Sequence, residues 1–107
     1  MDNVANSTVG VRYDAGKPRY DLLPADSLEE LVIVYTRGAE KYADRNWEKG
    51  MAWHRVFGSL MRHAWKFWRG EARDEETGCH HMAMVAWNAL ALCSYDLRKI
   101  GEDTRPQ

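Results

Sequence analysis

The chain has 107 residues and a mass of 12.4 kDa, which is enough for one domain and too little for two. Fifteen basic residues stand against sixteen acidic ones, and this near-neutral balance argues against a protein that coats nucleic acid. A hydrophobic share of 45% excludes disorder over most of the chain, and five tryptophans must either fill a core or stack on flat ligands.

Neither a secretion signal nor a membrane span is expected. The first twenty residues lack a basic segment followed by an apolar run. The longest apolar stretch, Met82–Cys93, is shorter than the about 20 residues that cross a bilayer. Cys79 and Cys93 lie on one predicted helix at a separation of about 21 Å, too far apart to bond. We therefore expect reduced thiols and a cytoplasmic protein.

For the N-terminal part of the chain, the sequence predicts a tail, an arm and a helix. We expect a flexible tail over residues 1–10 and an ordered extended arm over Val11–Pro24, which contains a glycine and a proline that oppose helix formation. Ser27-x-x-Glu30 has the pattern of a capping box, with Asp26 as a rival cap one residue earlier. We therefore expect the first helix to start at Ser27, with apolar residues at helical spacing along Leu28–Asp44.

Two more helices follow. The second is expected over Trp53–Arg69 and ends at Gly70, and the third over His80–Lys99, with a frayed end over residues 102–107. The third helix is apolar nearly all round, so it should lie at the centre. The sequence thus predicts an all-α fold, a compact bundle of three main helices in a single domain over residues 11–101. A second copy would complete its core.

Polar residues on the apolar third helix are the first candidates for chemistry. His81 and Asn88 share one stripe of that helix, and His63 lies at the border of the core face of the second helix. These residues either satisfy neighbouring backbone groups in a core or face a polar pocket for substrate or metal. Both interpretations stay open from the sequence.

Carboxylates form the second group of candidates. Glu71-x-x-Asp74, followed by two more acids, offers the oxygen ligands that Mg²⁺ prefers, although such a run is also typical of a solvated loop before a helix. Glu30 either belongs to the same site or closes its capping box.

Cations and aromatic rings form the third group. Lys17 and Arg19 on the arm, with Lys41 of the first helix, are expected to bind phosphates. Asn46 and Trp47 are a candidate pair for a base, because the ring stacks and the amide reads an edge. Of the other tryptophans, we expect Trp53 and Trp87 in the core and assign Trp65 and Trp68 to an interface or stacking surface.

The ordered motifs along the chain resemble those of the phage dATP/dGTP diphosphohydrolase N-terminal family, which is related to the all-α MazG nucleotide pyrophosphohydrolases. The resemblance covers about residues 12–98. It rests on these motifs: Tyr13-Asp-Ala-Gly-Lys-Pro-Arg19, Asp21-Leu-Leu-Pro24, Gly38-Ala-Glu-Lys-Tyr42, Arg45-Asn-Trp47, Arg62-His63, Gly70-Glu71, Asp74-x-Glu76-x-Gly78 and His81.

The resemblance implies cleavage of dATP or dGTP to the monophosphate and pyrophosphate, with Mg²⁺ or Mn²⁺, in a homodimer or larger homo-oligomer in the cytoplasm of a phage host. From the residues themselves we expect catalytic roles for Glu30, His63 and His81. The metal would be bound by Glu30, Glu71 and Asp74, and the substrate by Lys17, Arg19, Lys41, Asn46, Trp47 and Asn88.

The sequence leaves two alternatives to this function. The pattern Glu29-Glu30-x-x-Ile33 keeps only two of the three acids in the E-E-x-x-E motif of MazG-type enzymes. This departure favours the main alternative, a non-catalytic helical module that binds nucleotides or a partner. A nucleotide phosphohydrolase of the HD type would need a His-Asp dipeptide, which the sequence lacks. A role in membrane binding or in sequence-specific binding of nucleic acid is not expected.

Overall fold

The computed structural model describes residues 8–107 and contains three α-helices: α1 over Ala25–Tyr42, α2 over Trp53–Trp68 and α3 over His81–Arg98. Two short 3₁₀ helices, η2 over Tyr20–Leu22 and η3 over Asn46–Lys49, precede α1 and α2. The described residues form no β-strand, only two isolated bridges. The predicted all-α fold with three main helices is confirmed, while residues 1–7 of the predicted tail lie outside the described part.

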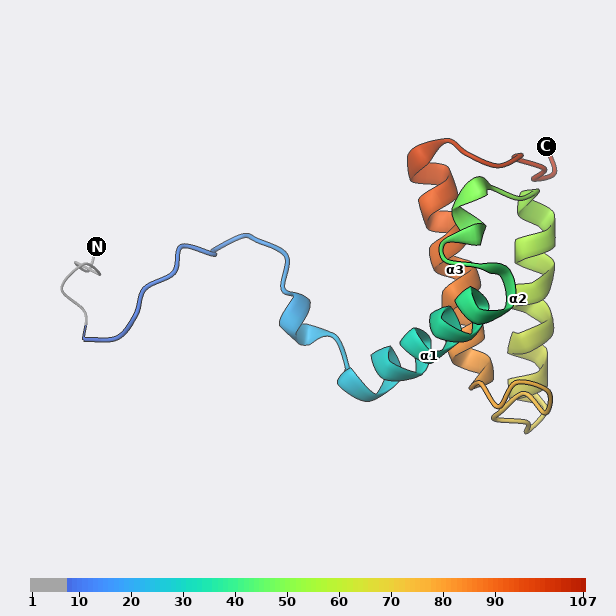
Figure 1. Ribbon diagram of the computed structural model, residues 1–107. Helices are drawn as coiled ribbons and strands as arrows, with labels where there is room; N and C mark the ends of the chain where they lie inside the picture. The colour runs from blue at the N-terminus through green and yellow to red at the C-terminus, as the bar shows by residue number, and fades with distance from the viewer. Residues whose placement is uncertain (1–7) are drawn as a thin grey trace.

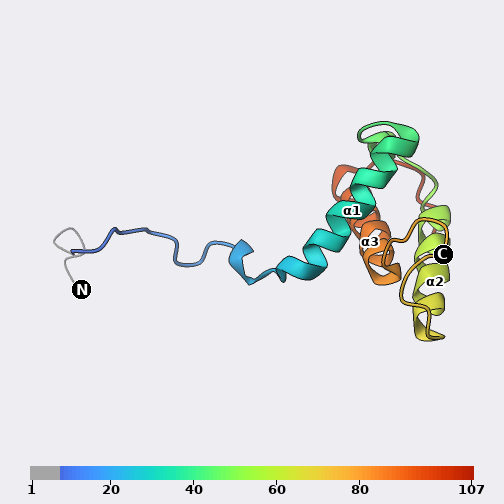
Figure 2. The ribbon, with the colours of Figure 1, turned by 60° about the horizontal axis from the view of Figure 1, so that its bottom comes forward.

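Helix α3 occupies the centre of the bundle, as its apolar sequence predicts. It packs against both α1 and α2, and Figures 1 and 2 show the three helices with α3 adjoining each of the others. Five of its residues are buried: the small Ala83 and Ala91, which let neighbouring helices approach, the large Tyr95, and the polar His81 and Asn88. No described helix is long and apolar enough to cross a membrane.

Aromatic side chains from three segments meet at one end of α3. Trp47 of η3 lies between Tyr35, Trp87 and Tyr95, with ring centroids 6.1–6.4 Å apart. The Tyr95 hydroxyl, which is fully buried, donates to the Trp47 carbonyl oxygen at 2.6 Å. Trp53 is buried in the same core, as expected, and Trp87 packs against it while half-buried. This cluster fixes η3 and α1 against α3.

The predicted capping box of α1 is wrong. The helix begins at Ala25, with Pro24 as its N-cap, so Ser27 already lies within it, and the Ser27 N–H donates to the carboxylate of Asp26 at 2.7 Å. Proline at the cap brings a backbone angle compatible with entering a helix, and its carbonyl accepts from Leu28 N–H at 3.1 Å. The Glu30 carboxylate, which the box would have used, is therefore free to bind elsewhere.

The predicted frayed C-terminus is wrong for residues 102–105. The Glu102 carbonyl accepts from Trp53 N–H at 2.9 Å, and the Thr104 hydroxyl accepts from His54 N–H at 3.0 Å. The Arg105 guanidinium lies 4.9 Å from the centre of the Trp53 ring. Because no side chain of α2 caps its N-terminus, these backbone donors need partners, and the C-terminal segment supplies them.

The arm over Val11–Pro24 leaves the bundle and is extended apart from a turn after Asp14 and η2 near its end, which agrees with the expected extended arm (Figure 1). Its contacts are local: Lys17 N–H donates to the Asp14 carbonyl, Leu22 N–H to the Arg19 carbonyl, and Arg19 makes a two-pronged ion pair with Asp21 at 2.7 and 2.6 Å. The radius of gyration is 19.0 Å, whereas a compact domain of about 100 residues has about 13 Å.

We predict that Tyr95→Phe lowers the free energy of unfolding by about 1–3 kcal/mol, because it leaves the Trp47 carbonyl without its donor in the core. Urea denaturation followed by tryptophan fluorescence measures the loss. Tyr13→Phe, at a tyrosine that is 77% exposed, is the matched control and should change nothing. Equal stability of both variants would contradict the assignment.

Candidate active site

The connection between α2 and α3 is an ordered loop. The Asp74 carboxylate accepts from both the backbone N–H and the hydroxyl of Thr77, each at 2.9 Å. The Asp74 N–H donates to the Cys79 carbonyl, and His81 N–H donates to the Ala72 carbonyl. Burial alone would raise the pKa of Asp74, but the hydrogen bonds from Thr77 hold that pKa below its ordinary value. These contacts hold the start of the loop against the first turn of α3.

Three side chains form a line of hydrogen bonds across this end of the bundle. His81 of α3 is fully buried, and its Nε2 lies 2.7 Å from the Glu71 carboxylate. Its Nδ1 lies 2.9 Å from Nδ1 of His63 on α2. A buried imidazole that bonds through both nitrogens is fully satisfied, so the line joins the loop, the centre of α3 and α2 into one unit.

The hydrogen-bond network assigns the protons on both rings. An ionised Glu71 only accepts, so His81 Nε2 carries the proton between them. In its neutral form His81 then accepts at Nδ1, and the proton of that bond sits on His63 Nδ1. The remaining nitrogen, His63 Nε2, keeps a free lone pair and has no hydrogen-bond partner among residues 8–107. The arrangement therefore holds a base with a fixed tautomer.

The environment keeps this base neutral. Burial lowers the pKa of His63 below its ordinary value, and the charge of a protonated His81 would lower it further. His63 is half-buried, so one side of its ring remains accessible. At neutral pH the ring is therefore an unprotonated acceptor at the surface of a buried polar line.

Glu30 ties α1 to the same loop. Its carboxylate makes a two-pronged ion pair with Arg73, with distances of 2.6 and 3.2 Å, and Arg73 also donates to the Gly78 carbonyl. The guanidinium holds the pKa of Glu30 below its ordinary value. Glu30 and Glu71 thus belong to one end of the molecule, joined through residues of the loop.

Two cations on α1 border a shallow cavity beside the loop. Arg37 and Lys41, one turn apart, line a space of about 350 Å³ together with Glu40, Glu76 and Thr77. Neither cation has an ion-pair partner within the described residues. The cavity is open to solvent and lined by two cations, two carboxylates and one hydroxyl, so it offers cationic side chains that a phosphate could bind.

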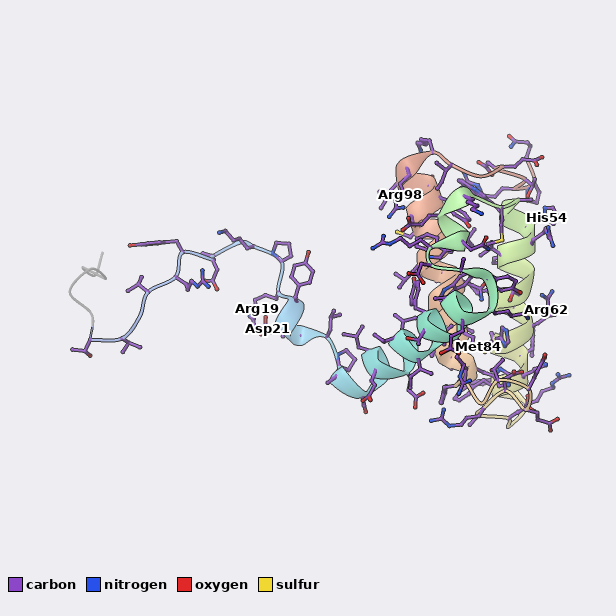
Figure 3. The ribbon with its side chains drawn as sticks, viewed as in Figure 1. Arg19, Asp21, His54, Arg62, Met84 and Arg98 are labelled. Carbon is purple, nitrogen blue, oxygen red and sulfur yellow. The ribbon has the colours of Figure 1, made fainter. Side chains whose placement is uncertain are left out.

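Several predicted site residues lie elsewhere. Arg19 is on the arm, far from the bundle and engaged by Asp21 (Figure 3), and Lys17 is on the same arm. The Trp47 ring is packed among other aromatics and has the Arg98 guanidinium 5.6 Å from its centre, which leaves little of it for a base. Neighbouring Asn46 opens η3 and is half-buried.

Asn88 satisfies a neighbouring backbone group in the core and does not face a polar pocket, the other role that the sequence left open. Its side-chain amide donates to the Met84 carbonyl at 2.8 Å within α3, so this buried polar group satisfies the backbone of its own helix. His81, on the same stripe, instead binds other side chains. The stripe therefore divides into one structural residue and one residue of the polar line.

The predicted metal ligands do not converge. Glu30 is bound to Arg73, Glu71 to His81 and Asp74 to Thr77. Within residues 8–107 no group of three or more His, Cys, Asp or Glu side chains is placed to hold a metal ion. The donor set has the oxygen chemistry that Mg²⁺ prefers, but its geometry does not fit a resident ion in this arrangement.

Comparison with known proteins gives the family. The model of the dATP/dGTP diphosphohydrolase N-terminal family matches residues 7–105. The chain belongs to this family. A "dATP/dGTP diphosphohydrolase" of Salmonella phage PMBT28 is 32% identical over 77 residues. That match covers 72% of this chain and 26% of the relative, so the chain spans about a quarter of the phage protein. No solved structure matches it.

Three side-chain contacts at this site were not predicted from the sequence. Arg73 binds Glu30, Thr77 holds the Asp74 carboxylate, and Glu71 orients a histidine where the sequence suggested a metal ligand. The four-residue spacing of Arg37 and Lys41 could have indicated a paired cation surface on one helix face. Nothing in the sequence pairs Glu30 with Arg73, which lies 43 residues away.

We predict that acidification from pH 7.5 to 5.5 destabilises the protein through His63. A pKa lowered in the folded state means that the unfolded chain binds more protons in this window. Stability is therefore present above the unfolded pKa of about 6.5 and is lost as the pH falls below it. Thermal unfolding at both pH values should show a smaller difference in His63→Asn, whose amide can still donate to His81. An equal pH dependence in both proteins would contradict this origin.

Proposed function

We propose that this protein hydrolyses dATP or dGTP between the α- and β-phosphates to the deoxynucleoside monophosphate and pyrophosphate. The family description and the name of the phage relative support a diphosphohydrolase of this substrate class. The observation that carries the proposal is the hydrogen-bonded line from Glu71 through His81 to His63. It supplies the base that hydrolysis by water needs.

In this proposal His63 Nε2 takes a proton from the attacking water. The water oxygen forms a bond to the α-phosphorus, the bond from that phosphorus to the bridging oxygen breaks, and pyrophosphate leaves with the electron pair. His63 becomes an imidazolium whose Nδ1–H still donates to His81, and His81 still donates to Glu71. The Glu71 carboxylate thus stabilises the positive charge through an intervening ring, as in other orienting triads.

The phosphates would lie toward the cavity on α1. Arg37 and Lys41 there offset the charge that develops on the leaving pyrophosphate. Lys17 and Arg19 remain predicted phosphate ligands, which would require the arm to reach a site on this or another copy. Asn46 remains a predicted base contact, with Trp47 restricted by its packing, and the predicted substrate role of Asn88 is given up because its amide is buried on the Met84 carbonyl.

We propose that the nucleotide binds as its Mg²⁺ complex, with Mn²⁺ as a substitute, so that the metal enters with the substrate. Glu30 and Asp74 remain predicted ligands of that ion and would have to exchange their present partners to bind it, whereas Glu71 stays on His81 and gives up its predicted metal role. No step assigned to His63 depends on a metal held by the protein. The proposed setting is the cytoplasm of a phage-infected cell, with the chain in a homo-oligomer.

The test is a panel of deoxynucleoside triphosphates with Mg²⁺ or Mn²⁺, scored for pyrophosphate release. We expect turnover of dATP or dGTP, and a loss of at least about 100-fold in kcat for His63→Ala because a general base is removed. His54→Ala, at an exposed histidine of the same helix, is the matched control and should keep its activity. Inorganic triphosphate as the product would instead indicate hydrolysis at the ester bond and overturn the proposal.

A non-catalytic nucleotide-binding module is the second candidate. It is favoured by the pattern Glu29-Glu30-x-x-Ile33, which lacks the third acid of the E-E-x-x-E motif, and by the lack of a ready metal group among the described residues. It predicts saturable binding of dATP or dGTP in calorimetry without turnover in either metal. Turnover that depends on His63 would exclude it.

A further inference from the structure

The two-pronged ion pair between Arg73 and Glu30 joins the loop to α1 at the surface of the molecule. The Arg73 side chain is 53% exposed and that of Glu30 is 28% exposed, so a ligand can reach the guanidinium. Both of its terminal nitrogens bind the carboxylate, at 3.2 and 2.6 Å. An exposed pair of this kind contributes little to stability, because water solvates both charges when they separate. Replacing Glu30 by another anion therefore costs little.

A turn of the loop gives the guanidinium a second anchor. Its Nη1 also donates to the Gly78 carbonyl at 3.1 Å, and the Gly78 N–H donates to the Asp74 carbonyl at 2.8 Å. The Asp74 carboxylate in turn accepts two hydrogen bonds from Thr77. The position of Arg73 therefore does not depend on Glu30 alone.

Arg73 continues the row of cations at the cavity on α1. Glu30, Arg37 and Lys41 are separated by seven and four residues, which places them on one face of that helix. Because Arg73 is bound to Glu30, its charge lies over the same face, about two turns before Arg37. The loop lines the cavity through Thr77, four residues after Arg73. Three cations thus follow one another along this face.

The same short stretch of loop carries the residue that orients the proposed base. Glu71, two residues before Arg73, binds the His81 ring at 2.7 Å. The carbonyl of Ala72, the residue between them, accepts from the His81 N–H at 2.9 Å. From Glu71 to Thr77 the loop therefore connects the polar line with the wall of the cavity, and Arg73 lies within this stretch.

We propose that Arg73 binds a phosphate of the nucleotide, and that it does so by exchanging Glu30 for that phosphate. This rests on the proposed function, whose substrate supplies the triphosphate. A guanidinium offers a phosphate the same pair of N–H groups that it offers a carboxylate, so the fork that binds Glu30 has the geometry required. A triphosphate carries more negative charge than one carboxylate, which favours the exchange. Glu30 is thus a competitor of the substrate for Arg73.

The test measures by calorimetry, in EDTA, the binding of α,β-methylene dATP, in which carbon replaces the oxygen between the α- and β-phosphates. Arg73→Gln should raise the dissociation constant at least about tenfold, because a charged two-pronged contact is lost. Glu30→Gln should lower it about two- to fivefold, because Arg73 no longer has to leave a carboxylate. Both variants break the same ion pair, so a purely structural strap predicts effects of the same sign.

Arg105→Gln is the matched control. Arg105 makes an exposed two-pronged pair with Asp103, at 2.9 and 2.7 Å, beside the start of α2, whereas the loop follows the end of that helix. Its loss should leave the dissociation constant unchanged. Circular dichroism checks the fold of each variant. Arg73→Lys, which keeps the charge without the fork, should bind with an affinity between those of the wild-type protein and Arg73→Gln.

Three results would overturn the proposal: an unchanged dissociation constant in Arg73→Gln, a rise in both Arg73→Gln and Glu30→Gln, or no binding of the metal-free analogue by the wild-type protein. Turnover of dATP separates this proposal from the proposed function. Hydrolysis together with one of these three results would remove only the role of Arg73. Binding that depends on Arg73 as expected, but without turnover, would remove only the hydrolysis.

Discussion

The burial of one imidazole, that of His81, is the constraint on which the rest of this end of the molecule depends. A fully buried ring needs a partner at each nitrogen, and these partners come from different segments: Glu71 from the loop after α2, and His63 from α2 itself. Meeting both demands requires an ordered loop, which Asp74 and Thr77 provide. The same arrangement leaves His63 Nε2 as an accessible acceptor. The hydrogen bonds that satisfy the buried His81 ring therefore also orient the base of the proposed reaction.

The opposite end is held by packing and backbone bonds. The aromatic cluster around Trp47 joins η3, α1 and α3, and the C-terminal segment binds the backbone donors at the start of α2. Between these two ends lies a bundle of three helices with α3 at its centre. The outer face of α2 remains uncovered and carries arginines but no acidic residue, so the near-neutral net charge of the chain conceals an uneven surface.

The sequence predicted the helices well because their signals are local. The spacing of apolar residues placed α2 within one residue of its end, and the all-round apolar character of α3 indicated its central position. The errors also have a common physical reason. The capping box at Ser27 and the frayed C-terminus were inferred from neighbouring residues, whereas the partners of Glu30 and of the α2 backbone come from segments more than 40 residues away.

The sequence by itself determined the all-α class, the order of the helices and the residue types of the site, since periodicity and composition depend only on nearby positions. Only the tertiary structure decided which polar groups meet. It made Asn88 a structural residue and His81 the middle of a polar line, although both occupy one stripe of α3. It also packed Trp47 against the core among other aromatic rings, where the sequence had suggested a ring free to stack on a base. The physical reason is that a hydrogen bond or a ring contact depends on distances between helices, and these follow from packing around α3.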